Sequence, residues 1–290
     1  MEKHTMKDGR DINRTARRKK ATITAVQWVL AIIVLIIIVF PIYWMLVSSV
    51  KSQEEILLPV PTLWPKEFHF ENYINVLKKG NFARYYFNTA VMTAGILIGK
   101  VLTGIFAGYG FSKGRFKGQN FCFIIVLGAL MIPLQVTFIP IYIMMANWGM
   151  SDTFLGLILP EAVSPYYIFM LRQTFMAIDD SYIEAARIDG ASELWVYARI
   201  ALPLEKPAIV TVALFSFVWS WTDFMGPLIY LTKSTKWTIS LGLSQFTNTY
   251  GVDWALLMAA SAIAILPMII LFFFLQNYFV EGSMSSGVKG

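Results

Sequence analysis

Six long apolar stretches constrain this chain more than any other feature of its sequence. They cover about Ala25–Val50, Tyr86–Phe111, Phe121–Asn147, Phe154–Leu171, Ala208–Leu231 and Trp254–Tyr278. A bilayer core requires about 20 apolar residues per helix, and these stretches lack the alternating polarity over about 10 residues that marks a membrane β-strand. We therefore predict an all-α, polytopic membrane protein with six transmembrane helices.

The composition agrees with burial in a membrane. Hydrophobic residues make up 57% of the 290 residues and charged residues only 14%, and the mean hydropathy is +0.59. A soluble domain of this length does not need so much apolar surface. We expect a basic N-terminal tail at 1–24, a six-helix membrane domain at 25–278 with an outer loop at 51–85, and a C-terminal tail at 279–290.

The first apolar run follows a basic segment, Arg10–Lys20, as the core of a secretory signal peptide would. The run is longer than the signal-peptide core of about 7–15 residues, and no small-residue cleavage site follows it. We therefore interpret it as a retained transmembrane helix.

Lys and Arg residues are distributed unequally between the two sides of the predicted membrane domain. Sixteen lie in the two tails and in the second and fourth loops, whereas seven lie in the other loops. Because cytoplasmic loops carry the excess of Lys and Arg, both termini and the fourth loop, 174–207, are predicted to be cytosolic. This bias accounts for the net charge of +6 without a nucleic-acid partner, and the basic tail is suited to contact anionic lipids of the bilayer.

Small residues and prolines predict how the helices pack. Gly95 and Gly99, and again Gly104 and Gly108, are spaced so that a second helix can approach closely. Prolines inside several of the runs predict bent helices around a cavity. Cys122 is the only cysteine, so no intramolecular disulfide is possible, and we expect it to pack as a small apolar residue.

The fourth loop contains a polar segment with signals for two short helices. Ser181 and Glu184 fit a capping box at the start of a helix over Tyr182–Asp189. Gly190 is placed to end this helix, because a C-terminal cap favours a residue that tolerates φ > 0. A second helix is predicted over about 192–200.

The first of these helices presents a small-residue face. Ala185 and Ala186 would permit close docking against another protein, and Ile188, Leu194 and Trp195 would supply apolar contacts. On local grounds alone, a plain cytosolic connector remains the alternative.

The segment Glu184–Pro203 fits the pattern E-A-A-x3-G-x9-I-x-L-P, which resembles the cytosolic signature loop of ABC-importer permeases. Similarity to the maltose-type carbohydrate permeases extends from about Leu46 to the end of the chain. The motifs that carry it are Phe70-Glu71-Asn72-Tyr73, Phe87-Asn88-Thr89, Met131-Ile132-Pro133-Leu134-Gln135, Leu171-Arg172-Gln173, Asp189-Gly190-Ala191-Ser192, Trp221-Thr222-Asp223-Phe224 and Gly287-Val288-Lys289-Gly290.

The resemblance implies a six-helix permease subunit of an ATP-driven importer for sugars or oligosaccharides in the bacterial cytoplasmic membrane. It implies assembly with a second permease subunit, two ATPase subunits and an external solute-binding protein. Because the sequence contains no P-loop, the chain is expected to bind no cofactor and to catalyse no reaction, with ATP and Mg²⁺ used by the ATPases. The residues expected to dock an ATPase are Glu184, Ala185, Ala186, Asp189, Gly190, Ile200 and Pro203.

Ionisable and aromatic residues inside the predicted helices are candidates for the solute path. Carboxylates accept hydrogen bonds from sugar hydroxyls and indole rings stack on sugar C–H faces, so Asp223, Trp219 and Trp221 are predicted to line it. The alternatives are a helix-to-helix hydrogen bond for Asp223 and simple packing for each tryptophan. Glu161 is a further candidate, and Lys100 would either line the path or pair with a carboxylate.

Three other functions compete with this interpretation. An ion-coupled secondary carrier would depend on Glu161 or Asp223, but it leaves the fourth loop unexplained. An intramembrane enzyme lacks support, because His4 and His69 lie outside the predicted bundle and no metal site or paired nucleophile and base is visible. An ABC importer of another cargo, such as glycerol phosphate, would favour cations in the path, for which Lys100 is the sole candidate.

Overall fold

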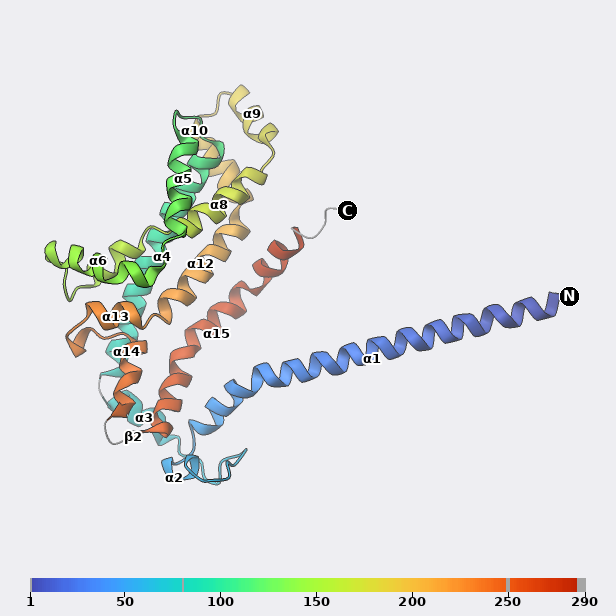
Figure 1. The fold of residues 1–290 in the computed structure, drawn as a ribbon, viewed down its shortest axis with the longest axis horizontal. Coiled ribbons are helices and arrows are strands. Elements are labelled where there is room, and N and C mark those ends of the chain that lie inside the picture. Colours follow the sequence, from blue (N-terminus) through green and yellow to red (C-terminus); the bar gives the residue numbers. More distant parts are fainter. Residues whose placement is uncertain (1, 80, 249–250, 286–290) are drawn as a thin grey trace. The chain divides into compact units, whose positions relative to one another are not determined.

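The computed structural model describes residues 2–79, 81–248 and 251–285, and it divides into two compact units in which helices predominate (Figure 1). The first unit contains the described residues up to Tyr73 together with Trp254–Ala262. The second contains the described residues of 74–253 and those from Ile263 onward.

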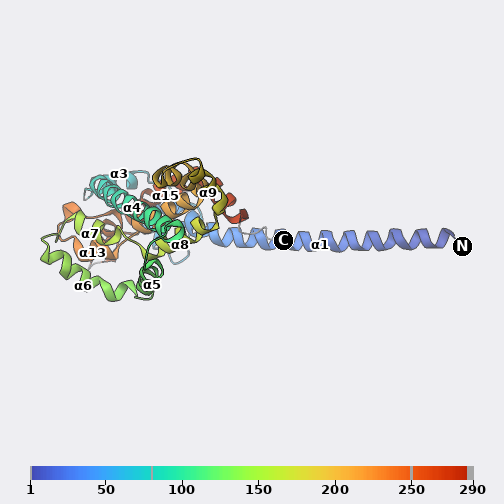
Figure 2. The same ribbon diagram turned by 90° about the horizontal axis from the view of Figure 1, so that it is seen from above.

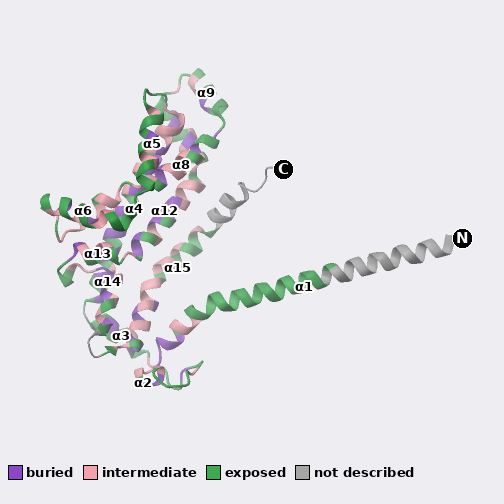
Figure 3. Ribbon diagram, in the orientation of Figure 1, coloured by how far each residue is buried: buried purple, intermediate pink, exposed green. Residues whose placement is uncertain are grey.

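The first unit begins with α1 (Glu2–Ser48), a continuous helix that includes the predicted basic tail. Its side chains are exposed throughout Thr22–Ile42 (Figure 3). The segment Thr22–Ser48 is long and apolar enough to cross a membrane. Exposed apolar surface on this scale is typical of a helix that lipid or another subunit covers.

The loop that contains α2 (Gln53–Ile56) is held together by polar groups with partners inside the first unit. The buried Glu55 carboxylate accepts a hydrogen bond from the Thr62 hydroxyl (2.5 Å), and the Lys51 ammonium donates to the Thr62 carbonyl oxygen. The Asn72 amide donates to the carbonyl oxygens of Ser49 (3.0 Å) and Lys51 (2.9 Å). Because buried polar groups require partners, these contacts stabilise one conformation of the predicted outer loop.

The remaining elements of the chain are mostly helices joined by short turns. They are α3 (Glu71–Lys78), α4 (Phe82–Lys113), α5 (Gln119–Leu130), α6 (Leu134–Asn147), α7 (Phe154–Glu161), α8 (Pro165–Ala177), α9 (Asp180–Ile188), α10 (Glu193–Val196), a π-helical turn (Tyr197–Ala201), α11 (Leu202–Leu204), α12 (Lys206–Trp221), α13 (Met225–Tyr230), 3-10 turns at Ser234–Lys236 and Ser244–Phe246, α14 (Ile239–Leu243) and α15 (Trp254–Ser285). One antiparallel hairpin departs from the predicted all-α class: β1 (Thr247–Asn248) pairs with β2 (Gly251–Val252).

In the second unit, α4 runs alongside α7, α8 and α12 (Figures 1 and 2). Its glycines permit this approach: a Cβ added at Gly99 would lie 2.6 Å from the Ala162 Cβ, and one at Gly108 would lie 3.0 Å from the Leu171 Cβ. Gly95 and Gly104 likewise face residues of α7 and α8. The close helix packing predicted from the glycine spacing is confirmed.

Two polar residues near the start of α4 hold the segment that leads into α14. The Asn88 amide donates to the carbonyl oxygens of Thr235 (3.0 Å) and Trp237 (2.9 Å). The Thr89 hydroxyl accepts a hydrogen bond from the Ile239 backbone N–H (2.8 Å). The Phe87-Asn88-Thr89 motif therefore has a structural role in this fold.

Within the described residues, four helices are long and apolar enough to cross a membrane, or up to six spans exist if each of two bent pairs is counted as one. The pairs are Gln119–Leu130 with Leu134–Asn147 and Glu193–Leu204 with Lys206–Trp221. The third run is not one straight helix, because α5 and α6 differ in direction by 103° across the break at 131–133. Pro133 lies in this break and has no N–H with which to continue α5. The fifth run is also interrupted: α12 ends at Trp221, and α13 is a separate helix. The bend at Pro133 agrees with the prediction of helices bent at prolines, whereas α1 and α15 continue through Pro41 and Pro267.

Cys122 is exposed on α5, so the expectation that it packs inside the chain was wrong. In the predicted C-terminal tail, α15 continues to Ser285, beyond the expected end at Tyr278. The motif Gly287–Gly290 lies outside the described residues.

Candidate functional site

The fourth loop folds into a helix-loop-helix made by α9 and α10. The Asp179 carboxylate caps α9 by accepting a hydrogen bond from the Ser181 backbone N–H (2.9 Å). The predicted capping box at Ser181 is therefore wrong, and α9 begins two residues earlier than expected. A carboxylate is favoured at this end of a helix, because the helix dipole places partial positive charge there.

The end of α9 matches the prediction for Gly190. This residue has φ of +80°, a backbone conformation that L side chains rarely adopt. Its N–H donates to the Arg187 carbonyl oxygen, and the Ala191 N–H donates to the Ala186 carbonyl oxygen, each at 3.0 Å. This pair of bonds is a Schellman motif, and it sets the direction in which the chain enters α10.

A small core and one ion pair make the helix-loop-helix a self-supporting element. Ile183 and Ala186 of α9 are buried against Val196 of α10. The Arg187 guanidinium donates two hydrogen bonds, of 2.6 and 3.1 Å, to the Glu193 carboxylate. Two-point pairing of this kind restricts geometry more than a single bond does, so α9 and α10 can move together.

A groove with a volume of about 730 Å³ opens between these helices. Its lining residues are Tyr182, Ala185, Ala186, Asp189, Gly190, Ala191, Ser192, Trp195 and Ile200. Large apolar side chains on the same element are exposed: Ile188 by 86%, Leu194 by 70% and Trp195 by 51%. Exposed apolar clusters of this kind mark surfaces that bind another protein or a membrane.

Five of the seven predicted docking residues line this groove, and two do not. Glu184 lies on the opposite side of α9, in a small depression that it shares with Lys113, Arg115 and Arg187. Pro203 is exposed on α11, outside the groove. The structure thus separates a largely apolar groove from a charged depression beside it.

Two sets of contacts connect the helix-loop-helix to α4. The Lys113 ammonium donates to the Ile178 carbonyl oxygen and to the Asp180 carboxylate, each at 2.6 Å. This hydrogen bond lowers the pKa of Asp180 below its ordinary value. After α10, the Tyr197 ring packs against Tyr109 and Phe106 of α4, with centroid distances of 4.9 and 5.4 Å.

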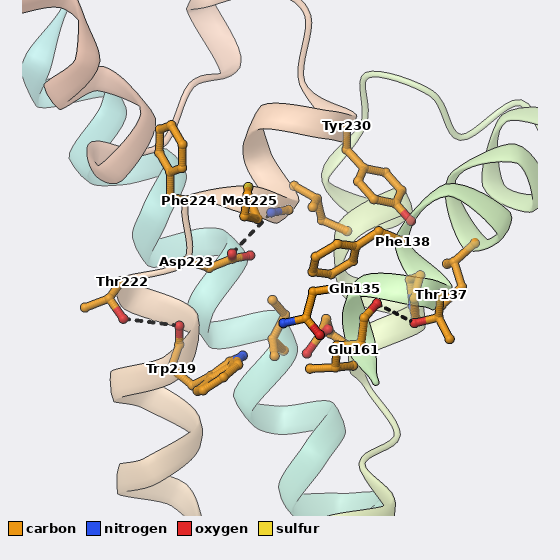
Figure 4. Close-up of a pocket in the computed structure, with 16 residues that line it drawn as sticks. Gln135, Thr137, Phe138, Glu161, Trp219, Thr222, Asp223, Phe224, Met225 and Tyr230 are labelled. Carbon is orange, nitrogen blue, oxygen red and sulfur yellow. Dashed lines mark hydrogen bonds between the residues drawn. The ribbon is translucent and has the colours of Figure 1, made fainter. Parts of the chain in front are cut away.

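A second hollow, with a volume of about 370 Å³, lies within the second unit at the other candidate residues (Figure 4). It is lined by Ile96, Leu134, Gln135, Thr137, Phe138, Ile141, Leu157, Pro160, Glu161, Trp219, Thr222, Asp223, Phe224, Met225, Gly226 and Tyr230. In Figure 4, Glu161 and Gln135 reach toward the space that Trp219 and Asp223 face. Cavities with a mostly apolar lining and a few convergent polar groups are typical ligand sites.

The cavity brings Glu161, Asp223 and Trp219 together but not Trp221. Trp221 is only 5% exposed, and its indole N–H donates to the Ala264 carbonyl oxygen at 2.9 Å. Residues two apart on a helix point about 200° away from each other, so Trp219 and Trp221 cannot line the same side. The prediction that Trp221 lines the path is not supported, and packing describes it better.

Lys100 belongs to α4 and lies behind the cavity rather than in its lining. Its ammonium is 2.5 Å from Glu161 Oε2, and the residue is 5% exposed. Asp223 Oδ1 accepts a hydrogen bond from the Gly226 backbone N–H (3.2 Å). Of the two alternatives for Lys100, the structure favours pairing with a carboxylate.

Several lining residues were not predicted, including Gln135, Thr137 and Phe138 of α6. Of these three, Gln135 alone had a sequence signal, since it ends the Met131–Gln135 motif. The structural role of Asp152 was also not predicted. Its carboxylate joins the turn before α7 to the segment after α13. It accepts hydrogen bonds from the Thr232 N–H (3.1 Å) and the Lys236 ammonium (2.9 Å).

Comparison with known proteins identifies the family. Residues 100–283 match the family described as the binding-protein-dependent transport system inner membrane component. The chain is 36% identical over 257 residues to the arabinooligosaccharides transport system permease protein AraQ of Bacillus subtilis, with 87% of this chain and 90% of AraQ covered. It is 33% identical over 261 residues to the sn-glycerol-3-phosphate transport system permease protein UgpE of Rhizobium meliloti, with 87% and 92% covered.

A solved structure supports the fold. The structure of this chain is similar to a crystal structure of a bacterial ABC transporter involved in the import of the acidic polysaccharide alginate. The TM-score is 0.81 and the sequence identity is 24%. The alignment covers 90% of this chain and 98% of that one. The chain therefore belongs to the family of binding-protein-dependent transport system inner membrane components, as a multi-pass permease subunit.

Proposed function

We propose that this chain is one of two permease subunits of an ATP-driven importer for sugars or oligosaccharides, and that it docks an ATPase through the groove between α9 and α10. The groove is the observation that carries this proposal. It is lined by residues between Tyr182 and Ile200, which include five of the predicted docking residues. It contains exposed Trp195, and Ile188 and Leu194 are exposed on the same two helices. Burial of such side chains at a protein interface is a main source of binding energy.

The membrane arrangement follows from the same proposal. The chain crosses the membrane six times, with α5 and α6 together forming one span and α12 forming another, and both termini and the helix-loop-helix lie in the cytosol. A second permease subunit completes the translocation path, two ATPase subunits use ATP and Mg²⁺, and an external binding protein delivers the solute. The excess of Lys and Arg on one side of the predicted spans supports this orientation.

The contacts of the helix-loop-helix supply a route for coupling. Closure of the ATPases would move α9 and α10 as one element, since Arg187 and Glu193 tie them together. Lys113 and Tyr197 would pass this motion to α4, whose glycine face packs on α7. Because α7 carries Glu161, a shift of α4 would change the shape of the cavity, as a two-state switch between outward- and inward-facing forms requires.

A carbohydrate is the cargo that the cavity supports best. Carboxylate and amide groups of Glu161, Asp223 and Gln135 are suited to hydrogen-bond sugar hydroxyls, and Trp219 offers an indole face. AraQ, which is named for arabinooligosaccharides, supports the same class. A phosphorylated solute is the second candidate, favoured by the similarity to UgpE, but the described lining residues include no Lys or Arg.

Purification and transport assays on paired variants test the docking proposal. Glu184→Lys reverses a charge in the depression on the other side of α9 from the groove, and Glu67→Lys makes the same change at an exposed position in the predicted outer loop. Each variant would be expressed with its native partners, purified in mild detergent, and reconstituted for uptake of a labelled oligosaccharide.

We expect Glu184→Lys to lose most of the co-purifying ATPase and most of the uptake, whereas Glu67→Lys keeps both. Equal behaviour of the two variants would contradict docking at this loop. A wild-type chain that purifies alone, and whose uptake follows an ion gradient and not ATP, would instead indicate a secondary carrier.

A further inference from the structure

The charges around the cavity do not balance. Among the described lining residues, Glu161 and Asp223 carry carboxylates, and no Lys, Arg or His contributes to the lining. Lys100 is the cation that contacts this set, through Glu161 Oε2 at 2.5 Å. With both carboxylates ionised and Lys100 protonated, the group has a net charge of minus one.

Lys100 is placed to orient Glu161 rather than to bind cargo. The Lys100 side chain is 6% exposed, whereas that of Glu161 is 32% exposed and reaches the cavity. Within the described part of the chain, the Lys100 hydrogen bond reaches Glu161 Oε2, and Oε1 accepts none. One oxygen of Glu161 is therefore held by the ammonium, and the other remains available to a hydroxyl or ammonium group of a solute.

Asp223 is held at the cavity by a glycine. Its Oδ1 accepts the Gly226 N–H at 3.2 Å, and a Cβ added at Gly226 would lie 2.4 Å from Asp223 Oδ2. A side chain at position 226 would therefore displace the carboxylate. The second negative charge thus also has a defined position, supplied by the turn between α12 and α13.

We infer that Glu161 and Asp223 determine the charge selectivity of the cavity, which accepts neutral sugars or cationic amino sugars and rejects solutes that carry a carboxylate or phosphate. The inference rests on the proposed function, since it assumes that solute enters this cavity. A unit charge about 8 Å away, at an effective dielectric constant of about 20, changes the local concentration of a monovalent ion by more than about tenfold. One unbalanced carboxylate is therefore sufficient to discriminate between anions and cations.

Thiol modification measures this selectivity without knowledge of the cargo. Cys122 is first replaced by Ser, and a single cysteine is introduced at Thr222, an exposed lining residue. The reconstituted full chain is treated with cationic and anionic methanethiosulfonate reagents of matched size. The ratio of the two rates is compared with the same ratio for a small free thiol in solution, so that intrinsic reactivity cancels.

The inference predicts a graded series of ratios. The parent should favour the cationic reagent at least about tenfold relative to the free thiol. Glu161→Gln or Asp223→Asn should bring the ratio close to that of the free thiol, and the two together should reverse it. Lys100→Met should raise the cationic preference further, whereas Lys79→Met, a loss of the same charge beside Asp253, should leave it unchanged.

The double variant Lys100→Met/Glu161→Gln separates charge from structural damage. It removes the ion pair but keeps the net charge of minus one, so it should retain the parent ratio. Equal ratios for parent, Glu161→Gln and free thiol would overturn the inference, as would absence of any reaction at position 222. Because the assay needs neither ATPase nor cargo, such a failure is distinct from a failure of sugar uptake, which would overturn the proposed function.

Discussion

The groove at α9 and α10 and the cavity at α7 and α12 are built in opposite ways. The groove is formed by neighbours in the sequence, between Tyr182 and Ile200, and it leaves apolar side chains open to solvent. The cavity gathers residues from Ile96 to Tyr230, and its ionised groups have defined partners such as Lys100. The groove therefore offers uncovered apolar surface to a partner, whereas the cavity holds its polar groups in fixed positions.

This difference implies that equivalent substitutions should have different consequences in the two regions. In the groove they should change association with the ATPase and leave the fold intact. At the cavity they should change stability and selectivity, because a partner removed from a buried ion pair leaves an uncompensated charge.

The largest effect is expected for Lys100→Met. Breaking a buried ion pair typically costs about 3–5 kcal/mol, and the partial exposure of Glu161 places the expected loss of unfolding free energy near about 3 kcal/mol. The matched change Lys79→Met breaks a pair whose side chains are 56% and 31% exposed, and it should cost less than about 1 kcal/mol. Thermal unfolding in detergent would compare the two, and equal shifts would contradict a buried pair at Lys100.

The groove should respond to Trp195→Asp. If Trp195 is covered by the ATPase, this change should weaken the complex by about 2 kcal/mol, which is about thirtyfold. Trp148→Asp is the matched control, since Trp148 is exposed to a similar degree (58% against 51%) but follows α6. Titration of detergent-solubilised permease with ATPase would show whether only the first variant binds less tightly.

Helix packing that joins the two regions is tested by Gly99→Ala. The added Cβ would lie 2.6 Å from the Ala162 Cβ, and overpacking of this kind costs about 1–3 kcal/mol. Gly110→Ala makes the same change on α4 with nothing within 4 Å, so it should be neutral or slightly stabilising. Unfolding measurements that ranked the two variants in the reverse order would disprove the close approach of α4 and α7.

The smallest effect concerns the Asp152 contacts near α13. A hydrogen bond from Lys236 lowers the pKa of Asp152 below its ordinary value of 3.8. The ionised group therefore adds stability that is present above pH 3.8 and is lost as the pH falls through the lower folded pKa. Between about pH 5 and pH 3, wild type should lose more stability than Asp152→Asn, and identical pH profiles would contradict this role.

Local features of the fold could be predicted from the sequence, because their causes are local. Gly190 was expected to end α9, since a helix end of this type needs a residue with positive φ, and it has φ of +80°. The glycine spacing of α4 likewise predicted close packing. The sequence analysis assigned the cap of α9 to Ser181, but the structure places it at Asp179. Both residue types can cap a helix, and the path of the chain after α8 decides which of them does.

The cavity could be predicted only in part. Lys100 and Glu161 are 61 residues apart, and nothing in either local sequence indicates that their helices meet with these side chains in register. Trp219 and Trp221 were assigned to the same path from their residue type alone. A separation of two residues places side chains about 200° apart on a helix. Helix geometry alone therefore excludes one of the two tryptophans from the lining of the path.

The central claim is that the helix-loop-helix couples an ATPase to the cavity, and a pair of glycine substitutions tests it most directly. Gly190 has φ of +80° and Gly118 has φ of +83°, and an added Cβ meets nothing within 4 Å at either position. Alanine therefore introduces a similar backbone strain of about 1–2 kcal/mol at both, but only Gly190 sets the direction of α10.

The measurement is ATP-driven oligosaccharide uptake by the reconstituted importer that carries either variant. If the helix-loop-helix couples the ATPase to the cavity, Gly190→Ala should lose most uptake while Gly118→Ala keeps most of it. Equal uptake by the two variants would contradict coupling through this element.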